Sequence, residues 1–523
     1  MNENPENFQY NSCIARGICS VNPRTSSLII ILVVYLRLAA KYCLKLLEKE
    51  PVPAELKELI LNTVAITVTG QEFNEQSFKN LISEYKKLLP MIFTRCNELF
   101  DEDFFKNEPI TSSELFTQTE NIVDAIKLGE RILKKVIFAL STEIRDLQQI
   151  VMIVAKSLSI SLLDLESFGH IDEKCFLTIL ELLDSVSTEC TETNFLKSKI
   201  LESVKVYKTV TEKLRKSQEE RYGKQNMMEV SYSTTAAKVV LVVGSNIREL
   251  ETVLEKLKDF EIDVYTHDEM MLAHTFPKFS EYKRLKGQYG QGIESCLIDF
   301  ATFPGPIILT KHSLHNIDNL YRGRLFTTDY TVPQGVIKIE NDDYGAVIDA
   351  SLLSKGFKKG KKCESIKIGY DYEYISEKID SKINSGIKRI FIISADNFSK
   401  ELKNYFEKLI KSTFKDTLII SFSYKFEYEK FIHINTCFDN YATIRIFDKV
   451  KTYGLPITVF IPKCSMNTIS EMIYFSEDKN TKVYSGKCTP IILNPSIMQT
   501  LKNIFNINSI TVVSDDLRDI TDS

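Results

Sequence analysis

The sequence predicts a multidomain α + α/β protein, with an N-terminal helical bundle followed by two Rossmann-like, doubly wound α/β domains. From residue 28 to about residue 225, apolar residues recur every three or four positions, which is the spacing of amphipathic helices. After residue 237 short apolar runs alternate with helix-like segments, the pattern of a parallel sheet covered by helices. At 523 residues the chain is long enough for two to four domains.

The helical region follows a polar N-terminal segment, residues 1–27, that contains two cysteines. The most apolar run of the chain is Leu28–Leu36, which ends at Arg37. A bilayer-spanning helix needs ~20 apolar residues, far more than this run supplies. The run also begins too late, after a polar segment, to resemble a signal peptide. We therefore expect a buried helix here, an antiparallel bundle over residues 28–225, and no membrane partner.

Two α/β domains are predicted from residue 238 onward. Residues 222–237 are polar and weakly patterned, which predicts a linker. The first domain, residues 238–362, opens with the strand Lys238–Val243 and the helix Ile247–Leu257, which Ser245 or Asn246 would cap. The lysine-rich stretch Lys355–Lys362 predicts the boundary with the second domain, residues 363–523. Further strands are expected at Ile307–Leu309, Arg324–Thr327, Arg389–Ser394, Thr417–Ser421, Ile457–Ile461 and Ile510–Val513, and helices at Ile293–Phe300, Phe398–Lys411, Tyr441–Lys449, Met466–Phe475 and Ile497–Phe505.

Composition and charge exclude several classes of protein. The net charge of −4 provides no basic field, so nucleic acid is not an expected partner. The eleven cysteines are scattered and odd in number, and no secretory signal precedes them. A disulfide framework is therefore not expected, and a reducing cytoplasm is the predicted location. No glycine-rich dinucleotide motif opens a helix and no Walker-type phosphate loop occurs, so the sequence predicts no nucleotide role.

The stretch from Val264 to Ala350 contains the most promising candidate site residues. It holds four of the six histidines: His267, His274, His312 and His315. Its strand Ile307–Leu309 ends directly in a polar string that includes His312 and Ser313. Ligands of open α/β sheets bind at the carboxyl ends of the strands. Glu269, His312 and Ser313 are therefore candidates, and two of the histidines, seven residues apart, would share a face if this segment were helical.

Several motifs of this stretch resemble those of the hybrid cluster proteins, also called prismane proteins or hydroxylamine reductases. These are relatives of the catalytic subunit of carbon monoxide dehydrogenase. The segment THDEMMLAH is similar to that family's THGEMLPAH, and QYGQG, FPGPIILT, RLFTT and DDYGAVIDA match its pattern in the same order. Weaker matches continue through TCFDNY and LPITVF, and SCIARGICSVNP matches near the N-terminus. The resemblance spans most of the chain and implies a prismane-like fold.

The resemblance also implies where the ligands of a metal cluster would lie. The family binds a hybrid Fe–S–O cluster through one His, two Glu and four Cys, and thiolates are the usual ligands of iron–sulfur clusters. Two of the seven positions are kept, Glu269 and Cys437, and these are the candidate catalytic residues. The other five positions carry Ser245, Ser313, Asp396, Phe422 and Ser465, with Phe422 aligned only loosely. Because Ser is a poor iron ligand and Phe is none, we expect the hybrid cluster to be absent or altered.

The remaining donors leave three alternatives for this site. One is a vestigial pocket filled by hydrogen bonds and water. A second is a single iron or zinc ion, because carboxylate, imidazole and thiolate groups suit either metal. Its ligands would be Glu269, His312, Asp396 and Cys437, which we expect to converge in one pocket between the two α/β domains. The third is a rebuilt cluster that recruits Cys464 or Cys296.

The N-terminal cysteines Cys13 and Cys19 match the last two of four cysteines that bind a cubane cluster in the family. The first two positions fall on Met1 and Asn4. Two thiolates cannot complete a [4Fe–4S] cluster within one chain, whereas two chains supply four. The resemblance to carbon monoxide dehydrogenase, which has a cluster bridged in this way, implies a symmetric homodimer with the cluster on its two-fold axis. The alternative is a pair of ordinary free cysteines.

Two classes of function follow from these observations. The first is an iron–sulfur oxidoreductase of the hydroxylamine or nitric oxide reductase type with a strongly altered or vestigial hybrid-cluster site. It would take electrons from a redox partner protein. The second is a non-catalytic, degenerate paralogue that serves a structural, assembly or electron-transfer role. The kept motifs favour the first class, and the five replaced ligands favour the second.

Overall fold

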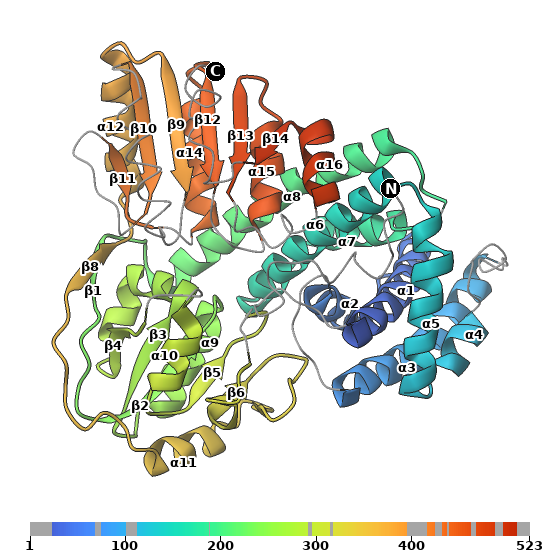
Figure 1. The fold of residues 1–523 in the computed structure, drawn as a ribbon, viewed down its shortest axis with the longest axis horizontal. Helices are drawn as coiled ribbons and strands as arrows, with labels where there is room; N and C mark the ends of the chain where they lie inside the picture. The colour runs from blue at the N-terminus through green and yellow to red at the C-terminus, as the bar shows by residue number, and fades with distance from the viewer. Residues whose placement is uncertain are drawn as a thin grey trace. The chain divides into compact units, whose positions relative to one another are not determined.

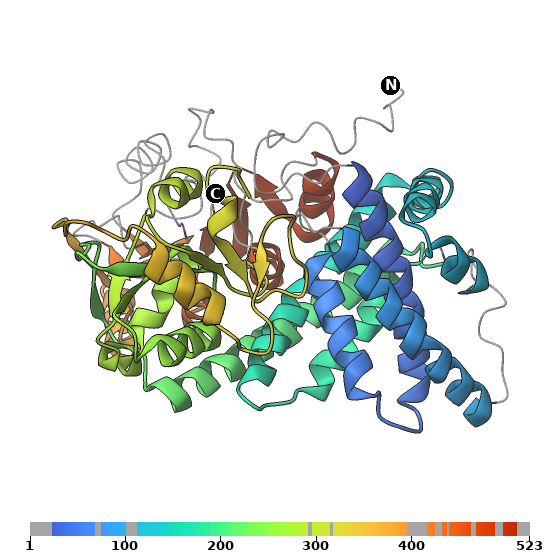
Figure 2. The ribbon, with the colours of Figure 1, turned by 90° about the horizontal axis from the view of Figure 1, so that it is seen from below.

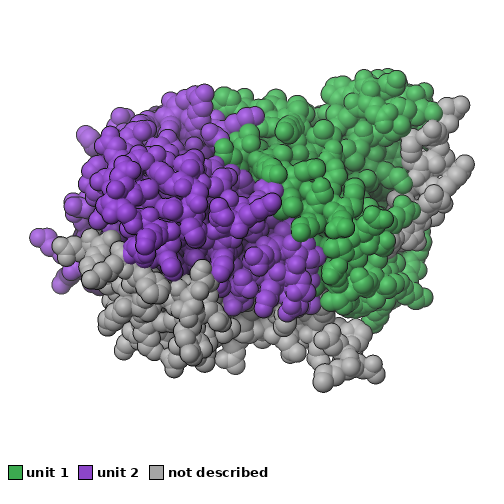
Figure 3. Space-filling model, turned by 90° about the horizontal axis from the view of Figure 1, so that it is seen from above, with its two compact units in different colours: residues 1–210, 314–317, 329–338 green, residues 211–313, 318–328, 339–523 purple. Residues whose placement is uncertain are grey.

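The computed structural model describes residues 23–67, 75–100, 112–187, 189–290, 295–313, 317–394, 416–423, 431–436, 439–461, 467–486 and 495–509. Figure 1 labels the helices and strands in these ranges. The chain divides into two compact units, coloured separately in Figure 3. Unit 1 comprises residues 1–210, 314–317 and 329–338. Unit 2 comprises residues 211–313, 318–328 and 339–523.

Unit 1 is built from helices, as the sequence predicts for this part of the chain. The blue helices α1, α2 and α3 run side by side in both views (Figures 1 and 2). Helix α1 packs against α2, α3, α5 and α7, so it forms the centre of the bundle. The helices are α1 (Pro23–Leu46), α2 (Ala54–Ile66), α3 (Glu75–Phe100), α4 (Ser112–Gln118), α5 (Ile122–Lys135), α6 (Thr142–Ser167), α7 (Glu173–Ser185) and α8 (Thr193–Tyr222), the last of which continues into unit 2.

Helix α1 contains the apolar run Leu28–Leu36. Ile31, Leu32 and Tyr35 have no exposed surface. Among the described residues, Arg24–Leu46 is the one helix long and apolar enough to cross a membrane, and 61 % of its most apolar window is buried in the protein. This burial agrees with the buried helix predicted from the sequence.

One segment from the α/β part of the sequence, residues 329–338, belongs to unit 1. The backbone N–H of Val332 in this segment donates a hydrogen bond of 3.1 Å to the hydroxyl of Ser77 on α3. The hydropathy pattern contains no sign of this return to the helical unit.

Two six-stranded sheets follow the bundle in sequence (Figure 1). The first has the order β4-β3-β2-β5-β6-β7, with parallel pairing from β4 to β6. The second is parallel throughout, in the order β11-β10-β9-β12-β13-β14. In both, the first strand in sequence lies at the middle, as in doubly wound Rossmann sheets. The strands are β2 (Lys238–Val243), β3 (Ile262–His267), β4 (Leu285–Gln288), β5 (Ile307–Leu309), β6 (Leu325–Thr327), β7 (Ile337–Lys338), β9 (Arg389–Ser394), β10 (Thr417–Phe422), β11 (Ile432–Ile434), β12 (Ile457–Ile461), β13 (Thr481–Ser485) and β14 (Ile507–Ser509).

The connections between these strands are mostly helical, which explains the alternating pattern of the sequence. The predicted helix Ile247–Leu257 coincides with α9, and Asn246 caps it by accepting a hydrogen bond from the Glu249 N–H. Two predicted elements, Ile510–Val513 and Phe398–Lys411, lie outside the described residues. The other helices are α10 (Cys296–Thr302), α11 (Gly345–Leu353), α12 (Tyr372–Asn384), α14 (Asn440–Lys451), α15 (Thr468–Ser476) and α16 (Pro495–Phe505), and the 3₁₀ helices η3 (Asp268–Thr275), η4 (Pro277–Glu281) and η6 (Arg322–Arg324).

A two-stranded antiparallel ribbon pairs a segment that precedes the first sheet in sequence with a segment that lies between the two sheets in sequence. It consists of β1 (Met228–Ser231) and β8 (Ser365–Ile368). Strand β1 lies inside the stretch that sequence patterning interprets as a linker. Val230 and Ile368 of the ribbon form a small apolar cluster with Met271 of η3, so the ribbon packs on the segment that follows β3.

Candidate functional site

The loops at the carboxyl ends of β2 and β5 meet where the strand order of the first sheet reverses. Val243 and Leu309, the last residues of these two strands, are paired in register. Ligands of doubly wound sheets bind at this kind of reversal. Ser245 follows β2 and is exposed, whereas His312 and Ser313 follow β5 and are partly buried. The structure places Ser313 after β5, as the sequence predicts, and also brings it to the end of β2, which the sequence does not predict.

Hydroxyl groups fill the space between these two strand ends. The Thr310 hydroxyl donates to the Val243 carbonyl oxygen at 3.0 Å, and the Ser313 hydroxyl lies within donating distance of two oxygens, 3.0 Å from Thr310 Oγ1 and 3.4 Å from the same carbonyl. A Cβ atom on Gly244 would lie 2.0 Å from Ser313 Oγ and 2.1 Å from Thr310 Oγ1. The φ angle of Gly244, +121°, also favours glycine. The Ser313 hydroxyl is thus bound to the protein itself in a tightly packed corner.

His312 has a left-handed backbone, with a φ angle of +60°. Such conformations are uncommon outside glycine and are maintained by their surroundings. Glu249 of α9 supplies part of that support, because its Oε2 accepts hydrogen bonds from the Lys311 N–H at 3.1 Å and from the Thr328 hydroxyl at 2.6 Å. One carboxylate therefore ties the loops after β5 and β6 to the first turn of α9.

The two histidines of the THDEMMLAH motif do not share a helical face. His267 ends strand β3, whereas His274 lies in η3. The Nε2 atom of His267, which is fully buried, lies 3.1 Å from Asp299 Oδ2, and this oxygen also accepts a 2.6 Å hydrogen bond from Ser295. His274 Nε2 lies 2.8 Å from the hydroxyl of Thr266, and burial lowers the pKa of His274 to about 4. Both rings are therefore engaged by neighbouring side chains.

Only part of the predicted site lies within the described residues. Glu269 is partly buried in η3, after β3, and His312 follows β5. Phe422 is buried at the end of β10, and Cys296 is buried on α10. Cys13, Cys19, Asp396, Cys437, Cys464 and Ser465 lie outside the described residues. Across the described ranges, no group of three or more His, Cys, Asp or Glu residues could hold a metal ion. The convergence of Glu269, His312, Asp396 and Cys437 stays a prediction.

A buried ion pair in unit 2 was not predicted from the sequence. Arg215 of α8 and Asp439 form two hydrogen bonds of 2.8 and 2.9 Å, and both side chains are almost completely buried. Burial alone would lower the pKa of Arg215, but the Asp439 carboxylate raises it. Arg215 also donates to Gln225 at 2.7 Å, and Gln225 donates to Thr275 at the end of η3, again at 2.7 Å.

This network connects segments that lie close in sequence to Glu269 and Cys437, the two ligand positions that the sequence analysis predicts. Asp439 lies two residues after Cys437 in sequence, and it caps α14 by accepting a hydrogen bond from the Ala442 N–H at 3.0 Å. Thr275 ends the 3₁₀ helix that contains Glu269. No short sequence motif could reveal the pair, because its partners are 224 positions apart.

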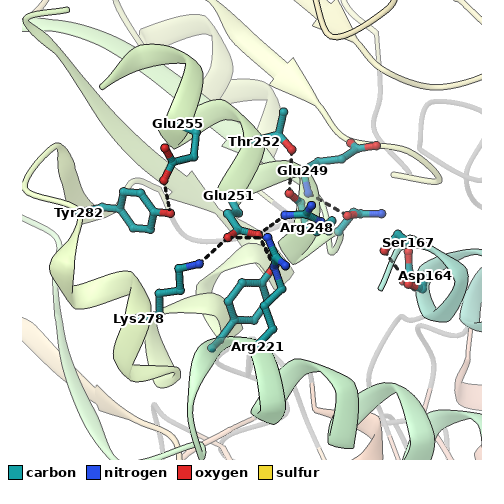
Figure 4. A network of polar contacts seen from close by, with 12 residues as sticks. Asp164, Ser167, Arg221, Arg248, Glu249, Glu251, Thr252, Glu255, Lys278 and Tyr282 are labelled. Carbon is teal, nitrogen blue, oxygen red and sulfur yellow. Dashed lines mark hydrogen bonds and ion pairs between the residues drawn. The ribbon is translucent and has the colours of Figure 1, made fainter. Parts of the chain in front are cut away.

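A second network surrounds Glu251 of α9 (Figure 4). Its carboxylate accepts hydrogen bonds from Arg221 at 2.8 Å, Lys278 at 2.7 Å and Tyr222 at 2.9 Å, and it also pairs with Arg248. Burial alone would raise the pKa of Glu251, but these donors lower it to about 2. The carboxylate therefore holds the end of α8, α9 and η4 together.

The geometry defines an α-helical and α/β protein whose candidate site lies at the carboxyl ends of parallel strands. The chain belongs to the Prismane/CO dehydrogenase family, whose model matches residues 9–518. It is similar to the hydroxylamine reductase of Thermodesulfovibrio yellowstonii, at 24 % identity over 98 % of each chain. The hydroxylamine reductase of Methanocella arvoryzae is 23 % identical over 97 % of each chain.

Solved structures of carbon monoxide dehydrogenases are also similar to the chain. Carbon Monoxide Dehydrogenase IV from Carboxydothermus hydrogenoformans aligns with a TM-score of 0.48 and 12 % identity, covering 98 % of this chain and 92 % of that one. The Ni-free carbon monoxide dehydrogenase from Thermococcus sp. AM4 aligns with a TM-score of 0.48 and 11 % identity, covering 100 % of this chain and 91 % of that one.

Proposed function

We propose that the chain is an iron–sulfur oxidoreductase of the hydroxylamine or nitric oxide reductase type whose hybrid-cluster site is strongly altered. Family membership and the chain-long similarity to hydroxylamine reductases support the oxidoreductase class. The observation that carries the altered site is the corner at Ser313, which occupies the position of a cluster cysteine in the resemblance. Its hydroxyl is hydrogen bonded to Thr310 and to the Val243 carbonyl.

The described residues at these positions do not fit the hybrid cluster. A cluster iron needs a deprotonated, soft donor, and thiolates supply it in most iron–sulfur sites. Ser313 offers a hydroxyl that is already hydrogen bonded, Ser245 offers an exposed hydroxyl, and Phe422 offers no donor atom. Of the described positions, only Glu269 retains the expected ligand type. We therefore derive no catalytic step through a hybrid cluster.

Iron is instead proposed at the N-terminus, as a [4Fe–4S] cluster shared by Cys13 and Cys19 of two chains. A symmetric homodimer in the cytoplasm, with a redox partner protein as electron donor, completes the proposal. In α1, next to this segment, Ile29, Ile30, Val33 and Val34 are only partly buried within the chain. These four side chains are the apolar surface that α1 can offer to a second copy.

The second candidate function is a non-catalytic paralogue with a structural, assembly or electron-transfer role. The replacement of five of the seven ligand positions in the resemblance supports it. The two candidates differ in turnover. A catalytic chain with the altered site reduces hydroxylamine slowly in steady-state assays with a chemical reductant, and Glu269→Gln or Cys437→Ser removes that slow activity. A paralogue shows no turnover that these substitutions affect.

A further inference from the structure

A basic strip, defined as residues 355–362, follows helix α11 in unit 2. Its lysines are all exposed. Within the part of the chain that the structure describes, their ammonium groups form no hydrogen bond or ion pair. Other lysines of unit 2 are paired, such as Lys278 with Glu251 at 2.7 Å and Lys449 with Asp380 at 2.9 Å. The lysines of the strip are Lys355, Lys358, Lys359, Lys361 and Lys362.

The backbone of the strip is held in place. Lys361 and Thr234 exchange two backbone hydrogen bonds, of 2.9 and 3.0 Å, and the Phe357 N–H donates to the Ala237 carbonyl at 2.9 Å. Gly356 has a φ angle of +61°, and a Cβ atom there would lie 2.3 Å from the Ala237 oxygen. The lysines are therefore displayed on a fixed frame, which reduces the conformational entropy that a partner must remove on binding.

The single aromatic ring of the strip points into the protein. Phe357 packs against Tyr265, Tyr289 and Phe303, with ring centroids 5.7 to 5.9 Å apart. The ring of Phe357 is partly buried and already in contact with three other rings, so it is a poor platform for stacking a nucleic-acid base. The net charge of the chain is −4, so the rest of the surface does not favour a long polyanion. A compact acidic protein, in contrast, can bind through the positive charge of the strip alone.

We propose that the basic strip docks a small acidic electron-transfer protein. This inference rests on the proposed function, because an oxidoreductase of that type needs an electron donor. Charge complementarity accelerates encounter and orients the partner. Leu353, the last residue of α11, is 87 % exposed beside the strip and provides an apolar contact within the charged rim.

The test measures binding by calorimetry, without turnover, so that it does not depend on a working active site. The probe is a purified bacterial [2Fe–2S] ferredoxin of net negative charge, titrated at 50 and 500 mM salt. Cytochrome c, a basic electron-transfer protein, is the probe of opposite charge. The test variant carries Lys→Gln at 358, 359, 361 and 362. A matched control carries Lys→Gln at four exposed lysines of unit 1: Lys79, Lys87, Lys134 and Lys135.

We expect the ferredoxin Kd of the test variant to rise about tenfold or more at 50 mM salt, and that of the control to stay within about twofold. Wild-type binding should weaken at least about tenfold between 50 and 500 mM salt, a result that requires no variant to fold. Equal affinity of the test variant and wild type, or an equal loss in the control, would overturn the inference. So would strip-dependent binding to duplex DNA or to phosphatidylglycerol vesicles without binding to ferredoxin.

The two proposals fail in distinguishable ways. If the chain contains iron and turns over hydroxylamine but does not bind ferredoxin, the docking inference alone is wrong. If ferredoxin binds through the strip but the chain contains no iron, the proposed oxidoreductase is wrong.

Discussion

Replacing Arg215 with Met should destabilise unit 2 more than any exposed ion-pair change. The substitution leaves the Asp439 carboxylate buried without its two hydrogen bonds of 2.8 and 2.9 Å. Removing one partner of a buried ion pair costs about 3–5 kcal/mol. With a shift of roughly 2–4 °C per kcal/mol for domains of this size, the melting midpoint should fall by about 6–20 °C.

The assay is thermal unfolding followed by circular dichroism, with Lys258→Met as the control. Lys258 pairs with Glu255 at 3.6 Å, and both side chains are half-exposed or more. Because exposed pairs contribute only ~0–1 kcal/mol, this control should move the midpoint by less than about 4 °C. The double variant Arg215→Met/Asp439→Asn should recover part of the loss, since the amide oxygen still caps α14 and no buried charge remains. A thermal unfolding midpoint of Arg215→Met within about 2 °C of the wild-type midpoint would refute the reasoning.

Three further predictions concern the strand ends and the pH dependence. Gly244→Ala should lower the melting midpoint relative to wild type, because its Cβ atom would meet Ser313 Oγ at 2.0 Å and Thr310 Oγ1 at 2.1 Å; a midpoint equal to that of wild type would contradict this packing. The folded pKa of Glu251, about 2, is below its ordinary value, so its contribution to stability is present above pH ~4.5 and is lost as the pH falls toward 2. The difference in urea midpoint between wild type and Glu251→Gln should therefore shrink over that window, and a constant difference would show that the charge is not involved. Hydroxylamine turnover with a chemical reductant should be far below that of relatives with the complete ligand set, and rapid turnover abolished by Glu269→Gln would contradict the altered site.

Hydrophobic periodicity predicts helices and strands whose signals lie within a short stretch of sequence. Strand β2 and helix α9 were predicted with the bounds that the structure shows, because an apolar run, an Asn cap and an amphipathic helix lie next to one another. The ribbon of β1 and β8 was missed, since its strands are short and the pairing joins Met228 to Ile368, far apart in sequence. Short strands with few apolar residues, such as β4, likewise leave little periodic signal.

In the candidate site, too, local features were predictable from the sequence and long-range contacts were not. The position of Ser313 at a strand end was predictable from the apolar run before it. Its hydrogen bond to Val243 was not, because that contact depends on β2 and β5 being neighbours in a sheet whose order no local pattern specifies. The support of the His312 loop by Glu249 and the Arg215–Asp439 pair are equally long-range contacts.

The most direct test of the altered-site account is the iron and acid-labile sulfide content of anaerobically purified wild type and Cys13→Ser. A cubane shared by two chains predicts about four irons per dimer in the wild type. Because the account places all of this iron on Cys13 and Cys19, Cys13→Ser should contain almost none. Iron that remains in Cys13→Ser and is lost in Glu269→Gln would contradict the account, since it would place a working cluster at the strand ends.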